Sequence, residues 1–520
     1  MSGIDGMPTI DSRPRAGAAA GRASVRWTRR ACRWAARLAR RGLQNGWGRG
    51  SKRAGATHCS LICLSAVVLA SCTSPKPQPT TSTSPLAQAE VPSQLPLPAG
   101  STLAADDTAP TWRSLVRSPW LTSLVEQAMA HNRDLSVAML NVERAQAQLA
   151  LANANRWPSV GVGLNASRSP ITSGPNAGKE ATSLSAGVQL SAWEIDLFGR
   201  LSSLSEAARA QLLATTAGKR AAELTLTAAV LQASLAVQAD TELIDIIRRS
   251  LDSRQESLRL TSLREAAGAA SQVELQAQQG LVAQTRATLA QLTRQQAQDR
   301  NVLGLLLGNS ATGIPEPPAR PKLVDEAWFA EVPVGLSSEV LLRRPDVAQA
   351  EQAMRAAQAN LLAARAALFP SITLTAQAGQ ASAQLSGLFQ VGHFGYSVAA
   401  SVVQTIFDAG RRQAGIASAD SAQRIAQVQY ERAIQAAFAD TADALAGLAT
   451  WRDQAQAQAT ATDAARQTLK LTQLRARQGA ASTLEQLDAE RSELAAEQAL
   501  LQARLGELAN RVALFKALGG

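Results

Sequence analysis

The residue types best suited to catalysis or metal binding are scattered in this chain of 520 residues. His131 and His393 are each solitary, with no cysteine or second histidine at the spacing of a metal site. No serine stands in a Gly-x-Ser-x-Gly setting, and no glycine-rich lysine motif for phosphate is present. We therefore expect neither an enzyme nor a site for a metal or nucleotide cofactor.

The one side chain that favours a covalent modification is the thiol of Cys72. It closes the segment Leu69-Ala70-Ser71-Cys72, which ends an apolar run from Leu61. The run is shorter than the roughly 20 residues of a membrane-spanning helix and is typical of an export signal. The segment resembles the bacterial lipobox, in which the cysteine is diacylated and becomes the new N-terminus. Thr73 follows in place of Asp, which in lipoproteins implies sorting to the outer membrane.

Charge and cysteine content separate a leader from the rest of the chain. The first 72 residues hold 13 of the 52 basic residues and 2 of the 41 acidic ones, so the remainder is neutral overall. Nucleic-acid binding, which a pI near 10.2 would suggest, has no support there. All four cysteines lie in the same segment, which excludes disulfides from the mature chain. We interpret 1–71 as a signal peptide with a mis-assigned start, and 72–111 as a lipidated Pro/Ser/Thr-rich tether.

The mature chain is organised around Trp193-Glu194-Ile195-Asp196-Leu197-Phe198-Gly199-Arg200. Before it, polar and apolar residues alternate over 183–190, which is the period of a strand with two unlike faces. After it, a helical pattern continues to about residue 266, on the order of 100 Å at 1.5 Å per residue. A second junction of this kind stands at 404–411, before a predicted helix over 411–478.

The two junctions belong to an internal duplication. Residues 346–372 align with 134–160 without a gap at an offset of 212, and Pro370 and Ser371 match Pro158 and Ser159. The turn Gly268-Ala269-Ala270-Ser271 recurs as Gly479-Ala480-Ala481-Ser482. We therefore predict a first repeat over 112–312, a linker over 313–334 and a second repeat over 335–520. Each repeat has two strands, a short helix, a long helix and a returning helix.

The returning helix of the second repeat shows a heptad pattern in steps of four and three residues. Seven of its nine positions are apolar, which predicts a coiled coil with a neighbouring helix. The nine positions are Leu487, Arg491, Leu494, Gln498, Leu501, Leu505, Leu508, Val512 and Phe515.

Four strands of about ten residues suit a tilted membrane crossing. Aromatic residues stand at the helix-facing end of every strand, as in an interfacial girdle. They are Trp157, Trp193, Phe198, Phe369 and Phe407. Because an open sheet edge cannot face lipid and the smallest membrane barrels have about eight strands, the chain must oligomerise. Two copies would give eight strands and three would give twelve, and a polar lumen favours the larger number.

The octapeptide, the segment 341–347 with Arg343-Arg344-Pro345-Asp346, and the lipobox together resemble the outer-membrane factors of tripartite efflux systems. These are the TolC/OprM-like channels, here of the NodT-type lipoprotein branch, and the resemblance covers about 112–518. It implies an α+β protein, a membrane β-barrel plus a long α-helical barrel. In that family a trimer forms a 12-stranded β-barrel and a 12-helix periplasmic tunnel, and two short helices stack end to end beside each long one.

The resemblance also implies an aperture at the periplasmic end. The family closes it with side chains near the start of the second returning helix, and the matching residues are Leu484, Asp488 and Arg491. Their spacing keeps them near one helical face. Arg491 also falls in the heptad pattern, so it faces either the coiled-coil seam or the pore. An ordinary solvated ion pair is the alternative interpretation of Asp488 and Arg491.

The function implied is a passive exit duct in the outer membrane for drugs or other small molecules. Its partners would be a periplasmic adaptor and an inner-membrane pump of the resistance-nodulation-division (RND) type, with no nucleic acid. A duct for type I protein secretion is an alternative with the same fold. A periplasmic adaptor lipoprotein is another, but it would have one helical hairpin and no membrane-type strands.

Overall fold

The computed structural model describes residues 89, 91–92, 94–95, 111–175, 177–309, 314–315, 322–323, 328–331, 337–390 and 392–520. These residues all belong to one compact unit, Thr83–Gly520. The leader, and Cys72 with it, lies outside the described residues.

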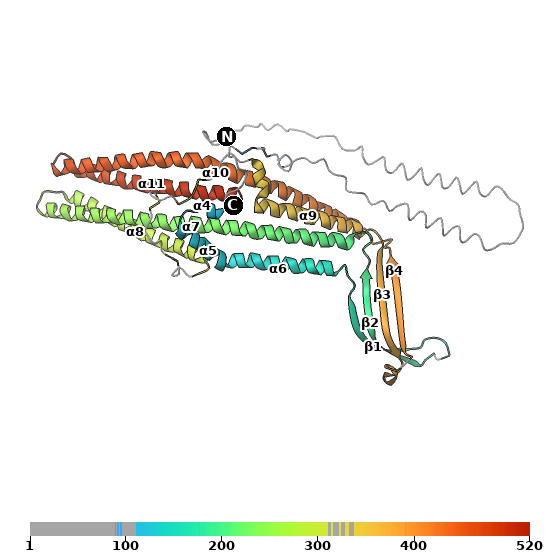
Figure 1. Ribbon diagram of the computed structural model, residues 1–520. Helices are drawn as coiled ribbons and strands as arrows, with labels where there is room; N and C mark the ends of the chain where they lie inside the picture. Colours follow the sequence, from blue (N-terminus) through green and yellow to red (C-terminus); the bar gives the residue numbers. More distant parts are fainter. Residues whose placement is uncertain are drawn as a thin grey trace, which may run out of the picture. The chain divides into compact units, whose positions relative to one another are not determined.

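Long helices dominate this unit (Figure 1). The α-helices are α4 Trp112–Leu115, α5 Pro119–His131, α6 Arg133–Ala154, α7 Arg200–Ala266, α8 Gln272–Leu306, α9 Pro345–Ala366, α10 Arg411–Arg477 and α11 Thr483–Ala517. Two short 3-10 helices are η2 Ser338–Arg343 and η3 Leu385–Gly387. The predicted long helices correspond to α7 and α10, and the predicted returning helices to α8 and α11.

The strands form one antiparallel sheet in the order β1-β2-β3-β4. Their bounds are β1 Val160–Pro170, β2 Glu180–Glu194, β3 Ser371–Ser382 and β4 Phe394–Val403. Because β2 comes from the first half of the chain and β3 from the second, the two halves share this sheet. β1 and β4 lie at its two edges, so the described part of the chain leaves one side of each unpaired.

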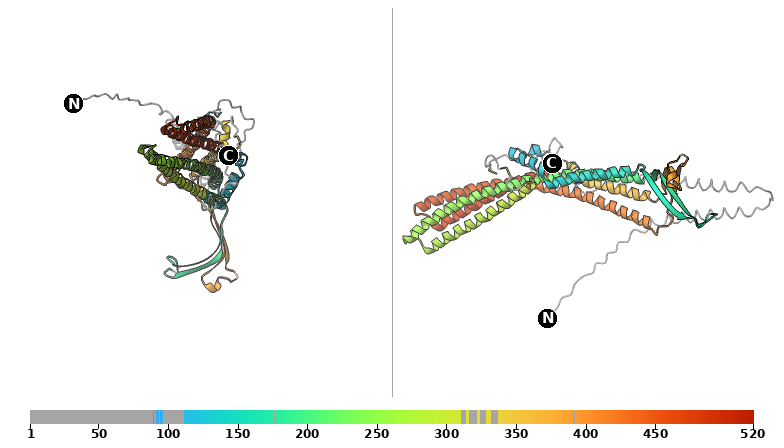
Figure 2. Two further views of the ribbon diagram at one scale, coloured as in Figure 1. Left: turned by 90° about the vertical axis from the view of Figure 1, so that its left-hand side faces the viewer. Right: turned by 90° about the horizontal axis from the view of Figure 1, so that it is seen from below.

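Each long helix has two shorter helices along it, which meet end to end (Figure 2). At the first joint, Asn132 caps α6 and donates from Nδ2 to the carbonyl of Leu306 at the end of α8, at 2.9 Å. At the second joint, Arg344 precedes α9 and donates from Nη1 to the carbonyl of Ala517 at the end of α11, also at 2.9 Å. The two capping residues differ in number by 212, so the duplicated halves repeat the same joint.

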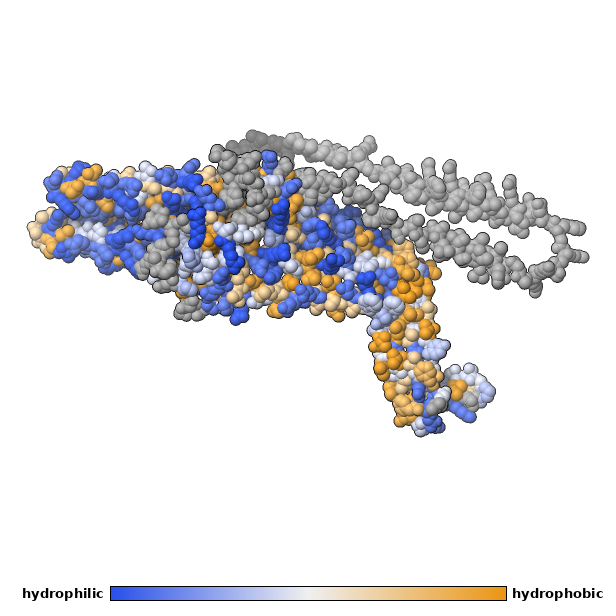
Figure 3. Space-filling model, viewed as in Figure 1, coloured by the Kyte–Doolittle hydropathy of each residue, from blue (hydrophilic) through white to orange (hydrophobic). Residues whose placement is uncertain are grey.

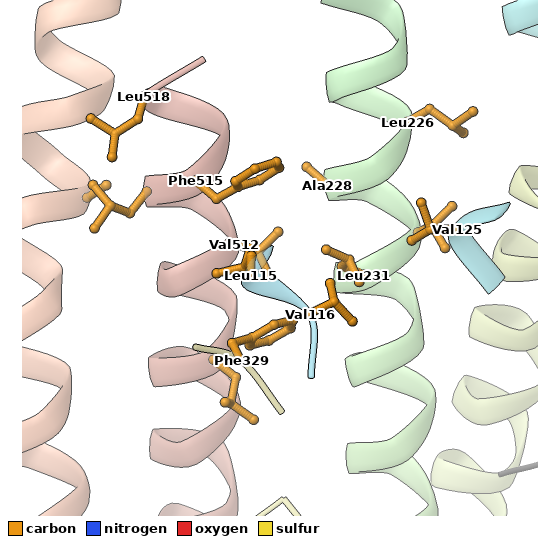
Figure 4. Packing of buried hydrophobic residues seen from close by; sticks show 14 of the residues in the cluster. Leu115, Val116, Val125, Leu226, Ala228, Leu231, Phe329, Val512, Phe515 and Leu518 are labelled. Atoms are coloured by element: carbon orange, nitrogen blue, oxygen red, sulfur yellow. The ribbon is translucent and has the colours of Figure 1, made fainter. Parts of the chain in front are cut away.

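The hydrophobic core lies beside these joints, between α7 and α11 (Figure 4). Leu231 of α7 and Phe515 of α11 are almost fully buried there, with Leu115 of α4 between the helices. By length and composition α7 could cross a membrane. Its residues from Leu226 to Leu235 nevertheless pack in this core, which accounts for their apolar character.

The two hairpins end in matching turns. Ser271 and Glu274 form a reciprocal capping box at the start of α8. Ser482 accepts the backbone N–H of Glu485 in the same way at the start of α11, at 3.2 Å. Gly268 and Gly479 both adopt φ of 74°, a left-handed conformation that glycine tolerates best. The turns therefore follow from the repeated Gly-Ala-Ala-Ser sequence.

Candidate channel wall and aperture

An aspartate just before each long helix accepts hydrogen bonds from backbone N–H groups of its first turn. Asp196 accepts the backbone N–H groups of Leu201 at 3.1 Å and Ser202 at 2.7 Å. Asp408 accepts the N–H of Arg412 at 3.1 Å at the second junction. A carboxylate here satisfies free N–H groups and complements the helix dipole. Burial raises the pKa of Asp196, but the backbone hydrogen bonds outweigh it, so the pKa lies below its ordinary value.

A β-bulge near the end of β2 decides which way the octapeptide faces. The register shifts between Leu190 and Trp193, and Ala192 adopts a left-handed φ of 34°. Simple alternation would place Trp193 on the polar face of the strand. The extra residue instead sets Trp193 opposite Leu374 and Glu194 opposite Thr373. The bulge therefore places Trp193 on the apolar face of the sheet and Glu194 on the polar face.

The sheet has two chemically distinct faces. By the register of the strands, one face is apolar and carries Val160, Val162, Leu164, Val188, Leu374, Tyr396, Val398 and Val402. Most of these large side chains are exposed in the single chain. Hydrophobic surface accordingly covers the strands in Figure 3. The polar face carries glycine, serine, threonine, asparagine and glutamine between them, and a hollow of about 590 Å³ lies on it. An exposed apolar band of this kind fits lipid.

The predicted girdle residues all lie at the helix-facing ends of the strands. Trp157 is 75% exposed and Phe407 is 85% exposed. Trp193 donates from Nε1 to the backbone carbonyl of Arg156 at 3.1 Å. Phe198 stacks on Phe369 with ring centroids 4.8 Å apart. The structure thus brings Phe198 and Phe369 together from the two repeats, and their contact with lipid stays a prediction.

Aromatic residues at the other end of the sheet were missed in the sequence. Phe394 and Tyr396 of β4 are exposed, and both lie on the apolar face, opposite Gln380 and Ala378. The alternation of these two aromatic residues with glycine and serine was visible in the sequence. Their position at the outer end became clear only from the register, because β4 begins there after the loop that follows η3.

The aperture candidates lie at the start of α11. Leu484, Asp488 and Arg491 are all exposed in the single chain. Asp488 Oδ1 accepts from Arg491 Nη1 at 3.3 Å. Leu487, the first position of the heptad pattern, is buried, whereas Arg491 is not. Arg491 therefore lies off the seam within one chain, while a pore-facing role stays a prediction.

Charged residues near the aperture candidates connect the two helical hairpins, α7–α8 and α10–α11. Arg254 of α7 is buried and donates to Thr285 Oγ1 of α8 at 2.5 Å. Burial lowers its pKa, the charge of Glu490 on α11 raises it, and that of Arg491 lowers it further. Glu497 of α11 lies 2.7 Å from Arg466 of α10 and 3.9 Å from Arg249 of α7.

These connecting residues were also missed. Arg254 follows Ile247 and Leu251 and precedes Leu258 and Thr261 at helical spacings of three or four. In this inward-facing row Ile247 and Thr261 are buried, and Leu251 and Leu258 are half-buried. The position of Arg254 in the row was therefore a sequence signal, because an arginine there must find partners inside the bundle.

A second charged contact joins α7 to α8. Burial raises the pKa of Asp240 to about 7, with the hydrogen bond and charge of Asp299 adding to the effect. Asp240 Oδ2 is buried without a hydrogen-bond partner among the described residues. Within the same residues, no group of three or more metal-ligating side chains is found.

Comparison with known proteins agrees with this geometry. The family described as "Outer membrane efflux protein" matches residues 124–309 and 336–520. The chain is 37% identical over 412 residues to the "Probable efflux pump outer membrane protein TtgC" of Pseudomonas putida KT2440, covering 79% of this chain and 84% of that one. It is 38% identical over 423 residues to "Outer membrane protein OprJ" of Pseudomonas aeruginosa PAO1, covering 80% and 87%.

A crystal structure of CusC, known in Escherichia coli as a "Cation efflux system protein", has a similar fold. The TM-score is 0.72 at 34% identity, over 82% of this chain and all but 2% of that one. The chain therefore belongs to the outer membrane efflux protein family. It is an outer-membrane channel protein with a periplasmic helical extension, and its family is not a class of enzymes.

Proposed function

We propose that this protein is the outer-membrane exit channel of a tripartite RND-type pump, and that it passively conducts drugs or other small molecules. The observation that carries the proposal is the two-faced sheet with two open edges. Three copies would pair β4 of one chain with β1 of the next and close twelve strands into a barrel. The polar face would then line the lumen.

Energy for export must come from partners. The matched turns at Gly268 and Gly479 are the ends of the two hairpins, and we propose that a periplasmic adaptor contacts them. Relatives differ in what their names say they export, since CusC belongs to a cation efflux system. The proposal for this chain is therefore limited to small molecules.

The test is complementation of a strain that lacks its own outer-membrane channels. The host would supply a periplasmic adaptor and an RND pump of a tripartite efflux system. We expect the protein to restore resistance to several drugs, and cysteines placed at the hairpin turns to cross-link to the adaptor. Failure of both, with secretion of a protein cargo restored by type I partners, would favour the alternative duct.

We further propose that Cys72 carries a covalent lipid as a second anchor. Acyl chains add about 0.8 kcal/mol of membrane affinity per buried CH₂. Because the barrel anchors the protein by itself, Cys72→Ser exported by an unrelated cleavable signal should still insert into the outer membrane. Fractionation measures this directly, and complete loss of membrane association would contradict the barrel assignment.

A further inference from the structure

The polar face of the sheet is built almost entirely from uncharged residues. Alternate residues face this side over Gly161–Ser167, Ala181–Gln189, Thr373–Ala381 and Gly395–Ser401. Every one of them is glycine, alanine, serine, threonine, asparagine or glutamine. The wall therefore offers hydroxyls, amides and backbone, but no fixed charge, over this height.

The one charged residue that the register of the four strands sets on this face is neutralised. Glu194, at the end of β2, lies opposite Thr373 because of the bulge. Arg200 donates from Nε to Glu194 Oε1 at 2.8 Å and from Nη2 to Oε2 at 2.5 Å. The two-point contact pairs the charges where the strand meets α7.

A row of four glycines crosses the middle of this face. Gly163, Gly187, Gly379 and Gly395 lie directly opposite one another on the four strands. A Cβ on Gly187 or Gly379 would collide with the backbone of the other strand, so these two are required by the close approach of β2 and β3. A Cβ on Gly395 would meet nothing within 4 Å.

The glycine row lies in the hollow of about 590 Å³ on this face. Gln189 and Gln377, which face each other across β2 and β3, line the same hollow one row closer to the helices. No side chain stands at Gly187, Gly379 or Gly395, so this part of the face is recessed relative to the amide row. At Gly163 the Gln189 amide reaches over the glycine, 3.2 Å from where a Cβ would stand. In a closed barrel, repetition in every copy would make the recess a ring.

We propose that the barrel part of the duct passes solutes without regard to the sign of their charge, and that the glycine ring is its least obstructed level. The inference rests on the proposed function, since it needs the polar face to line a closed lumen. Fixed charges around a pore produce ion preference, and the described strand residues of this wall carry none that is unpaired. His393, which precedes β4, also lines the hollow at its outer end. Any charge preference of the whole channel then originates in the helical tunnel below.

The mature chain offers a clean test, because no cysteine follows Cys72. Gly395→Cys would be reconstituted as the trimer in planar bilayers and treated from the outer side with cationic or anionic thiosulfonate reagents. We expect both reagents to react at rates within about threefold of each other. Each should then shift the reversal potential according to the charge it attaches. Ala399→Cys on the same face is the second variant if Gly395→Cys does not assemble.

Val398→Cys, on the exposed apolar face of the same strand, is the matched control and should not react. Reaction with the cationic reagent about tenfold faster than with the anionic one, or the reverse, would overturn the inference, because a charged wall concentrates one sign. Reaction at Val398→Cys but not at Gly395→Cys would overturn the assignment of faces. Absence of any channel in the unmodified protein would instead contradict the proposed function.

Discussion

Arg344 shows how one residue can join three helices. It is buried, and it contacts Asp346 of α9 at 2.7 Å, Asp440 of α10 at 3.2 Å and the end of α11. Burial raises the pKa of Asp346, but the bonds and charge of Arg344 outweigh it and hold that pKa below its ordinary value. The carboxylate therefore stabilises the joint above its unfolded pKa, and this contribution is lost as the pH falls through the lowered value.

We expect Arg344→Ala to lower the free energy of unfolding by about 1.5 to 3 kcal/mol, the range for hydrogen bonds to charged groups. The loss stays moderate because Asp346 and Asp440 are 48% and 61% exposed and remain hydrated. Urea unfolding followed by circular dichroism measures it. The control Arg355→Ala removes an exposed i,i+4 pair with Glu351 and should cost under about 0.5 kcal/mol. Equal midpoints for the two variants would contradict the account of the joint.

The sequence singled out the segment around Arg344, but not its role. Its partners at Ala437 and Ala517 lie 93 and 173 residues away, a distance over which no local pattern acts. The same holds for Arg254 and Glu497, whose partners come from other helices. Local chemistry explains what could be predicted, since a Gly-Ala-Ala-Ser turn or an Asp at a helix start needs only its neighbours.

At the scale of elements, periodicity was sufficient for the helices and strands. The predicted first long helix, 200–266, coincides with α7 because its apolar spacing continues without interruption. The bulge at Ala192 was not predictable, because alternation continues through Ser191 and the extra residue appears only when β2 is paired with β3. The outer position of Phe394 and Tyr396 likewise depends on register.

The α7–α8 contact should depend on pH through Asp240. Its folded pKa of about 7 lies above the ordinary value of 3.8, so the stabilising contribution is fully present below about 3.8 and is lost as the pH rises from there to about 7. We expect Asp240→Asn to unfold a few degrees above the wild type at pH 8, with a clearly smaller gap at pH 5. Differential scanning calorimetry measures both.

The control for this prediction is Asp252→Asn, an exposed carboxylate on the same helix. Its difference from the wild type should be the same at the two pH values. A gap for Asp240→Asn that is equally large at pH 5 and pH 8 would show that the α7–α8 contact does not titrate in this range.

For the whole molecule, the aperture is the place where three chains would meet. Exposed ion pairs such as Asp488–Arg491 are worth about 0.2 to 1 kcal/mol each. Three contacts of this strength between neighbouring chains would bias opening by about 0.6 to 3 kcal/mol, or roughly 3- to 150-fold. We expect the double variant Asp488→Ala, Arg491→Ala to conduct more in planar bilayers. Wild-type closure should weaken at high salt, because salt screens exposed charges.

The matched control removes the i,i+3 pair Glu256–Arg259, which is exposed on α7. Its channel should behave as the wild type. Unchanged conductance in the Asp488 and Arg491 variant would mean that these residues do not close the aperture, and exposed Leu484 at the same helix face would be tested next.

The number of chains in the membrane form decides whether the four-stranded sheet closes into a barrel. One chain supplies a four-stranded sheet with β1 and β4 as open edges, and lipid offers no hydrogen bonds to such edges. Native mass spectrometry of the mature, lipidated protein in detergent measures the copy number. We expect three copies that resist dilution, whereas a stable monomer in the same micelles would contradict a closed trimeric barrel.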